Sequence, residues 1–324
     1  MMYLQWVLSK YLRYRYVSPQ TILKCLVIIT VLYKLQNKEN SEESKVVRRK
    51  TLPSVLIIGA RKCGTRALID MLNLHPQVEK AQLEVHFFDR DENYEKGLEW
   101  YESQMPEITE NQISIEKSPS YFVTPEVPER VYGMNSTIKL LLIVREPVTR
   151  VISDYTQIYY YSNSTNNASR SAAPPPPPPL SSLILHPDGS INYNYKATRI
   201  SIYSRYLQRW VDIFPTSQIH VIDGDALIRD PFTQLQEVEK FLNLEARLKR
   251  EDFYFNSTKG FYCWKKRNDY NDTNHNTVHC LNDSKGRKHP NVDRRVIRKL
   301  REFYRPFNQK FYNMVGRDFG WPEN

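Results

Sequence analysis

Glycine is scarce in this sequence, and several patterns that would assign a function directly are missing. Only 10 of the 324 residues are glycine, so each glycine in a loop carries more information than usual. No internal repeat is apparent, which argues against solenoids and other repeat architectures. The chain also lacks the recognition motifs of nucleic-acid-binding proteins, and only its positive charge argues for that class. We therefore expect no nucleic-acid partner.

Acidic residues are outnumbered by basic ones. The formal net charge is +10 and the isoelectric point is about 9.2. This balance favours an anionic partner such as nucleic acid, a phospholipid surface or an acidic polysaccharide, and composition alone does not choose among the three. With 40% hydrophobic residues, the chain can bury a full core in one large domain or in two.

The N-terminal apolar run, residues 21–33, is shorter than the ~20 residues that a bilayer span prefers, and Lys24 interrupts it. Basic residues precede the run and a charged stretch follows it, as in a signal-anchor that leaves the catalytic part in the lumen. A cleaved signal and an amphipathic tail are the alternatives. The expected segments are a cytoplasmic tail at 1–20, a signal-anchor at 21–35, a stem at 36–52 and a lumenal catalytic domain at 53–324.

Two further features favour the secretory pathway. Sequons, which favour a glycoprotein, occur at Asn135, Asn163, Asn167, Asn256, Asn271 and Asn282. Of the four cysteines, Cys25 lies in the tail and Cys63 in a loop. In an oxidising lumen, the remaining pair, Cys263 and Cys280, is expected to form a disulfide. A zinc site that combines this pair with nearby histidines is an alternative, although the spacing matches no standard zinc finger.

Buried strands alternate with amphipathic helices along most of the chain. Continuous apolar runs at 55–58, 138–144 and 219–222 are typical of strands covered on both faces. Apolar residues at helical spacing follow them, for example at 65–74 and from Pro147 onward. This alternation predicts an α/β fold with a central parallel sheet flanked by helices. Ligands of such sheets bind beyond the carboxyl ends of the strands.

A polar segment at 162–182 breaks this alternation. It contains an unbroken proline run at 174–179, which is expected to form an extended polyproline helix. One interpretation is a ligand for SH3-type domains. The lumenal features favour the other interpretation, a proline-rich surface insertion in the catalytic domain.

The loop after the first predicted strand has the features of an anion site. It reads GARKCGTR at 59–66 and joins a buried strand to a helix. This geometry presents unpaired backbone N–H groups and the positive end of the helix. Lys62 can neutralise a phosphate or sulfuryl oxygen, and Thr65 can donate its hydroxyl. The loop is shorter than a Walker A motif and its lysine precedes the second glycine, so it indicates phosphate binding but not ATP.

A second anion site is expected at the end of the strand at 138–144. Arg145 stands at this strand end, and Ser153 lies in the early turns of the following helix. An arginine that binds in a bidentate manner, together with a hydroxyl, can hold a second phosphate. Two anion sites at neighbouring strand ends fit a bis-phosphorylated nucleotide such as 3′-phosphoadenylyl sulfate (PAPS).

Seven short runs, in order between 53 and 321, carry a family resemblance. They are RKCGTR at 61–66, EVHFFD at 84–89, EKSPSY at 116–121, PERVY at 128–132, SDYTQ at 153–157, GFYC at 260–263 and KGR at 285–287. Together they resemble the heparan sulfate glucosamine 3-O-sulfotransferases, and DENY at 91–94 and FNQKFY at 307–312 look most like isoform-5-like members. The resemblance implies a P-loop-like sulfotransferase fold, PAPS as donor, heparan sulfate as acceptor, and a single-pass type II protein of the Golgi membrane.

The same resemblance implies roles for individual residues. Glu84 is the general base for the acceptor hydroxyl, with His86 and Asp89 as further catalytic residues. Lys62 stabilises charge on the bridging oxygen. Considered without the resemblance, a purely structural Glu84–His86 pair is an equal alternative. The residues expected at the donor are Lys62, Cys63, Gly64, Thr65, Arg66, Arg145, Ser153, Tyr262, Lys285, Gly286, Arg287, Lys288 and His289. Those expected at the acceptor are Glu84, Val85, His86, Phe87, Phe88, Asp89, Arg90, Lys117, Ser118, Pro119, Ser120, Gln157, Tyr195 and Lys196. No metal is expected.

The chain departs from the family pattern in two places. Cys63 stands where the family usually has glycine, and it would be strained if its φ were positive. The proline run replaces a loop that is not proline-rich in relatives. The implied activity is transfer of the sulfuryl group of PAPS to the 3-hydroxyl of glucosamine in heparan sulfate. The alternatives are sulfation of another glycan position and a non-catalytic heparin-binding module that kept the fold.

Overall fold

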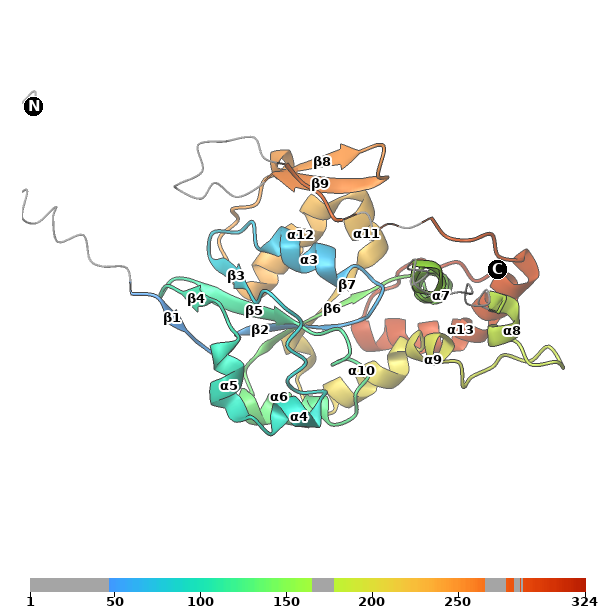
Figure 1. Ribbon diagram of the computed structural model, residues 1–324, viewed down its shortest axis with the longest axis horizontal. Coiled ribbons are helices and arrows are strands. Elements are labelled where there is room, and N and C mark those ends of the chain that lie inside the picture. Colours follow the sequence, from blue (N-terminus) through green and yellow to red (C-terminus); the bar gives the residue numbers. More distant parts are fainter. Residues whose placement is uncertain (1–46, 165–177, 266–277, 283–285, 287) are drawn as a thin grey trace, which may run out of the picture. The chain divides into compact units, whose positions relative to one another are not determined.

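The computed structural model describes residues 47–164, 178–265, 278–282, 286 and 288–324 (Figure 1). The expected signal-anchor at 21–35 lies outside these residues, as do the expected tail and most of the expected stem. Among the residues that are described, no helix is long and apolar enough to cross a membrane. This finding corrects the expected localisation as a single-pass type II protein of the Golgi membrane. The chain from Arg49 to Asn324 forms one compact unit.

A five-stranded parallel sheet forms the centre of this unit. Its strands lie in the order β3 (Val78–Lys80), β5 (Ile113–Lys117), β2 (Val55–Gly59), β6 (Lys139–Val144) and β7 (Ile219–Asp223). Every neighbouring pair is parallel, so all carboxyl ends lie at one edge. The strands next to β2, which are β5 and β6, both come later in the chain, and such a switch in strand order leaves a crevice at the edge. The predicted α/β fold with a central parallel sheet is confirmed.

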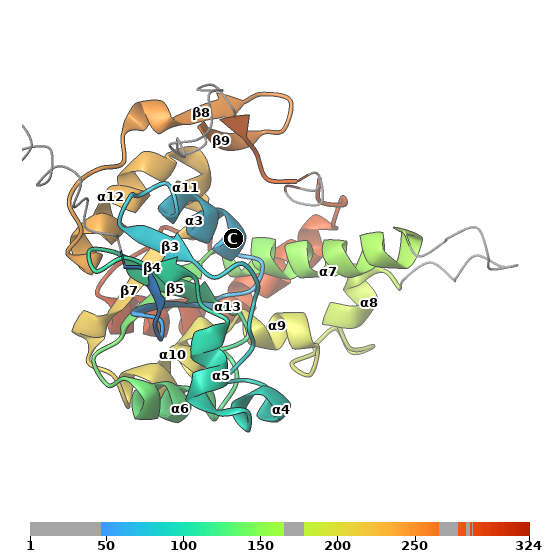
Figure 2. The same ribbon diagram turned by 60° about the vertical axis from the view of Figure 1, so that its left-hand side comes forward.

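Helices cover both faces of the sheet (Figures 1 and 2). One face carries α3 (Thr65–Leu72), α11 (Gly224–Arg229) and α12 (Pro231–Leu242). The other face carries α5 (Gly97–Ser103), α6 (Val127–Met134) and α10 (Tyr203–Val211). Two long helices, α7 (Pro147–Ser164) and α13 (Arg294–Val315), contact each other. The shorter helices are α4 (Asp91–Tyr94), α8 (Leu180–Ile184), α9 (Lys196–Ile200), η1 (Thr216–Gln218) and η2 (Arg250–Asp252).

Local sequence explains where these elements begin and end. All five residues of β2 are buried, as expected of a strand between two helical layers. α3 begins after Gly64, whose φ of 109° favours glycine, and it ends at Leu72, two residues earlier than predicted. α12 begins with Pro231 after Asp230, whose carboxylate accepts the Thr233 N–H. The helix starts were therefore easier to predict than the helix ends.

Two small antiparallel sheets accompany the central one. β1 (Arg49–Lys50) pairs with β4 (Glu107–Ile108). The second small sheet contains β8 (Phe253–Asn256), β9 (Phe261–Lys265) and β10 (Val278–His279). Cys263 of β9 and Cys280, which follows β10, are joined by a disulfide with an S–S distance of 2.01 Å. Because both sulfurs are bonded to each other, they cannot serve as the thiolate ligands of the zinc alternative.

The polar insertion expected at 162–182 has helical ends. α7 continues through Ser164, and α8 begins at Leu180, whose side chain is buried. Residues 165–177, with most of the proline run, lie outside the described residues. A segment that looked uniformly polar in sequence thus begins and ends inside regular structure.

Candidate active site

The loop after β2 lies at the carboxyl edge of the sheet, between two other loops. Ile57 of β2 lies opposite Lys117 of β5, and Gly59 lies opposite Leu142 of β6. Parallel strands in this register end together, so the segments that follow them are neighbours. Two groups of charged residues lie here. We call them the donor cluster (Lys62, Arg145 and His289) and the acid cluster (Glu84, His86, Asp89 and Lys117).

A buried arginine that sequence reasoning missed holds the loop after β2. Arg150 of α7 is 0% exposed, and its Nε donates to the Arg61 carbonyl at 3.0 Å. Its Nη2 lies 2.6 Å from Asp154 Oδ2, and Arg61 Nη2 lies 3.2 Å from the other oxygen of that carboxylate. The four-residue spacing of Arg150 and Asp154 on a helix is the one sequence signal for this network. The network orients both the backbone and the side chain of Arg61.

Cys63 occupies its place in the loop without backbone strain. The positive φ angles nearby belong to Lys62 (75°) and Gly64 (109°), not to Cys63. The thiol is 0% exposed, and burial raises the pKa of Cys63, so it is protonated at neutral pH. The conflict that the sequence raised for a cysteine at this position therefore does not arise.

The donor cluster brings together three residues from distant segments. Arg145 leaves the end of β6, and its Nε lies 2.7 Å from Asp225 Oδ1. Burial lowers the pKa of His289, and the positive charges of Arg145 and Lys62 lower it further. His289 is therefore a neutral imidazole beside two cations. Lys62 Nζ also donates to Gln157 at 3.0 Å, so a residue expected at the acceptor contacts the donor cluster.

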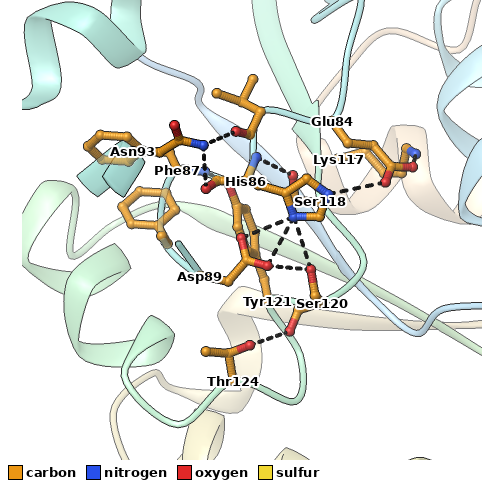
Figure 3. Close-up of polar contacts among 12 residues, drawn as sticks. Glu84, His86, Phe87, Asp89, Asn93, Lys117, Ser118, Ser120, Tyr121 and Thr124 are labelled. Atoms are coloured by element: carbon orange, nitrogen blue, oxygen red, sulfur yellow. Dashed lines mark hydrogen bonds and ion pairs between the residues drawn. The ribbon is translucent and has the colours of Figure 1, made fainter. Parts of the chain in front are cut away.

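The acid cluster surrounds a single imidazole (Figure 3). His86 Nε2 lies 3.5 Å from Glu84 Oε2, and its Nδ1 lies 3.0 Å from Asp89 Oδ2. Lys117 Nζ donates to Glu84 Oε1, and Ser120 Oγ donates to Asp89. Glu84 and His86 therefore form the bonded pair considered as the structural alternative. However, the Glu84 side chain remains 41% exposed, so it is also open to a substrate.

Hydrogen bonds outweigh burial in setting the charges of the acid cluster. Burial alone would raise the pKa of Glu84, but the bonds from His86 and Lys117 lower it to about 2. The bonds to Asp89 and then Glu84 raise the pKa of His86 to about 9. Burial also opposes ionisation of Asp89, yet bonds from His86 and Ser120 lower its pKa. At neutral pH the cluster is an imidazolium between two carboxylates.

The backbone beneath the acid cluster is fixed from the core. His86 has a φ of 53°, and its N–H donates to Ser118 Oγ at 3.0 Å. The Phe87 N–H donates to Tyr121 Oη at 3.0 Å. Phe87 and Phe88, which were expected at the acceptor, are 1% and 0% exposed. Both side chains are therefore part of the core beneath the acid cluster.

The remaining predicted residues differ in exposure. The exposed ones are Arg66, Arg90, Lys196, Gly286 and Lys288. The half-buried ones are Gly64, Val85, Ser153, Tyr195 and Tyr262. The buried ones, besides the two phenylalanines, are Thr65, Ser118 and Pro119. Lys285 and Arg287 lie outside the described residues. Arg66 pairs with Asp70 at 2.9 Å along the surface of α3.

Known proteins match the chain over most of its length. The family described as "Sulfotransferase domain" matches residues 52–315. Heparan sulfate glucosamine 3-O-sulfotransferase 5 of Homo sapiens is 53% identical over 272 residues, which cover 84% of this chain and 74% of that relative. Heparan sulfate glucosamine 3-O-sulfotransferase 3B1 of Homo sapiens is 45% identical over 274 residues, which cover 84% of this chain and 65% of that relative.

A solved structure supports the fold independently. A sulfotransferase from Alicyclobacillus acidocaldarius superposes with a TM-score of 0.58 and covers 83% of this chain and 98% of its own. It is 18% identical in sequence, so it supports the fold alone. The family match and the sequence identities carry the assignment further. The family match shows a sulfotransferase domain, and by the sequence identities the chain belongs to the heparan sulfate glucosamine 3-O-sulfotransferase family.

Proposed function

We propose that this chain transfers the sulfuryl group of PAPS to the 3-hydroxyl of a glucosamine residue in heparan sulfate. The names of its relatives support sulfuryl transfer to this position of this acceptor. The structural observation that carries the proposal is a cationic donor cluster and an ionised acid cluster beyond the ends of adjacent parallel strands. A nucleotide sulfate and an acceptor hydroxyl are the reactants that such a pair of clusters suits.

On the donor side, positive charge and backbone N–H groups hold the nucleotide. Lys62 and the start of α3 receive the phosphosulfate, because a helix N-terminus and an ammonium both favour an anion. Arg145 receives the second phosphate, with its guanidinium steadied by Asp225. His289 stays neutral there and can donate or accept a hydrogen bond without adding charge.

The transfer step uses Glu84 as the base. The acceptor oxygen forms a new bond to sulfur, and its proton passes to the Glu84 carboxylate. The bond between sulfur and the bridging oxygen breaks, and the electron pair leaves with 3′-phosphoadenosine 5′-phosphate (PAP). Lys62 stabilises the charge that develops on this bridging oxygen.

His86 and then Lys117 limit how strong a base Glu84 is. A carboxylate with a pKa of about 2 is ionised but accepts a proton weakly, and a base works best when its pKa is nearer the working pH. The Lys117 side chain is 4% exposed and bonds to Glu84 Oε1.

One labelling experiment tests the proposal. The full chain is incubated with sulfur-labelled PAPS and heparan sulfate, and the product is digested to locate the new sulfate. We expect label on the 3-oxygen of glucosamine. Label on the nitrogen or the 6-oxygen would contradict the assigned position. Binding of heparan sulfate without transfer would indicate a non-catalytic heparin-binding module.

A further inference from the structure

One buried hydroxyl contacts both loops that hold the donor, and the proposed transfer step does not use it. Tyr203 is the first residue of α10 and is 1% exposed. Its Oη donates to the Arg145 carbonyl at 2.9 Å and accepts the Arg145 N–H at 3.5 Å. The Sγ of Cys63 lies 3.4 Å from the same oxygen. A single atom therefore joins the segments that follow β2 and β6.

The hydrogen-bonding capacity of this hydroxyl is fully used. A tyrosine hydroxyl has one proton to donate and two lone pairs that accept. The proton goes to the Arg145 carbonyl, one lone pair receives the Arg145 N–H, and the other is left for the Cys63 thiol. Cys63 is fully buried, and a buried thiol in the neutral form is a donor. A glycine at position 63 could not make this contact.

The packing around the two loops leaves little freedom for a different arrangement. A Cβ at Gly224 would lie 2.4 Å from the Cys63 carbonyl oxygen and 2.9 Å from the Val144 carbonyl oxygen. The backbone at the start of α11 is thus in close contact with both loops. The Tyr203 ring packs separately, with ring centroids 5.6 Å from Phe311 and 5.7 Å from Trp321. The ring therefore packs against other aromatic side chains, whereas the hydroxyl bonds to the two loops. These two roles can be tested separately.

We propose that Tyr203 and Cys63 are positioning residues that fix the spacing of the two donor loops, so that both ends of one bis-phosphorylated nucleotide are held at once. The inference rests on the proposed function for its choice of ligand. If the loops drift apart, the nucleotide keeps each of its contacts only part of the time, and affinity for the donor falls. The polysaccharide does not contact the Tyr203 hydroxyl, so the affinity for the polysaccharide stays the same.

The first test is Tyr203→Phe in the full chain. This variant keeps the ring and removes the hydroxyl that bonds to the backbone N–H and carbonyl of Arg145 and contacts the Cys63 thiol. We expect the Kd for PAP, measured by calorimetry, and the KM for PAPS to rise about 10-fold. The KM for heparan sulfate stays within about twofold, which a general loss of folding would not produce. Tyr206→Phe is the matched control, because Tyr206 is 5% exposed on the same helix and, in the described structure, bonds to neither loop.

Variants at Cys63 test the thiol contact separately from the other contacts of the Tyr203 hydroxyl. Cys63→Ala is expected to weaken PAP binding about 3-fold, and Cys63→Ser, which keeps a donor, is expected to restore it. Combined with Tyr203→Phe, the alanine variant should add little further loss, because the contact between the thiol and the Tyr203 hydroxyl is already gone.

The outcomes distinguish this inference from the proposed function. Wild-type PAP affinity in Tyr203→Phe would overturn the positioning role. If that variant does not fold, equal affinities of Cys63→Ala and Cys63→Ser would overturn it instead. A wild-type chain that binds PAP but sulfates no heparan sulfate would contradict the proposed function, while the nucleotide measurements would still decide the positioning role.

Discussion

The two oxygens of the Glu84 carboxylate have different partners, and this determines what a substitution removes. Lys117 bonds to Oε1, and His86 lies beside Oε2. Glu84→Gln keeps the size of the side chain but cannot take a proton. We expect kcat to fall by about 10²-fold or more, while the Kd for PAP stays at the wild-type value because Glu84 is outside the donor cluster. Glu92→Gln, at an exposed position in α4, is the control. Unchanged turnover would remove Glu84 from the base role.

His86 makes the stability of the fold depend on pH in a predictable direction. Its pKa rises from 6.5 to about 9 in the folded chain because Asp89 and Glu84 favour the imidazolium. A raised pKa stabilises the fold fully below the unfolded value, and this stabilisation is lost as pH rises through about 9. We expect urea denaturation to show a gap in unfolding free energy between wild type and His86→Asn that is widest near pH 6 and closes towards pH 10. A gap independent of pH would contradict this account.

At the scale of an element, α7 holds the loop after β2 through Arg150, which donates to the Arg61 carbonyl, and Asp154, which pairs with the Arg61 side chain. Arg150 and Asp154 lie one turn apart and are 0% and 5% exposed. Arg150→Met leaves the buried Asp154 carboxylate with less compensation and frees the Arg61 carbonyl. We expect a loss of about 3–5 kcal/mol in the free energy of unfolding, measured in urea.

A double variant tests whether the stability of the fold depends on the Arg150–Asp154 ion pair or on the packing of these side chains. Adding Asp154→Leu to Arg150→Met removes the uncompensated charge, so most of the lost stability should return. Arg150→Met also frees the Arg61 carbonyl, so PAP binding is expected to weaken. The double variant should not restore this binding. Recovery of both properties together would show that α7 supports the fold but does not position the donor loop.

Element boundaries show where local sequence is informative. The starts of α3 and α12 follow from Gly64 and from the pair Asp230 and Pro231, because glycine, capping carboxylates and proline act on their immediate neighbours. The extent of the polar insertion was overestimated. Leu180 is buried by tertiary packing within a segment whose composition is polar, and composition does not register a single buried side chain.

At the scale of the whole molecule, the chain carries a formal net charge of +10. Such a field draws an anionic polysaccharide inward, and salt screens it, with a Debye length of about 10 Å at 0.1 M and about 3 Å at 1 M. We expect the KM for heparan sulfate to rise by roughly an order of magnitude over this range, more steeply than the KM for PAPS, whose partners are partly buried. Steady-state kinetics at several salt concentrations measures both. Equal slopes would show that the field of the whole chain does not steer the polymer.

The sequence by itself predicted three strands of the central sheet (β2, β6 and β7), the helix starts at Thr65 and Pro147 and the family, and it suggested an anion site in the loop after β2. These features depend on periodicity, on residues with special backbone preferences and on short contiguous runs. Only the tertiary structure decided that Asp225 holds Arg145, that Arg150 holds the Arg61 carbonyl and that Tyr203 joins two loops. The partners in these contacts are between 58 and 140 positions apart in the chain. Because strand order brings them together, no local pattern in the sequence records them.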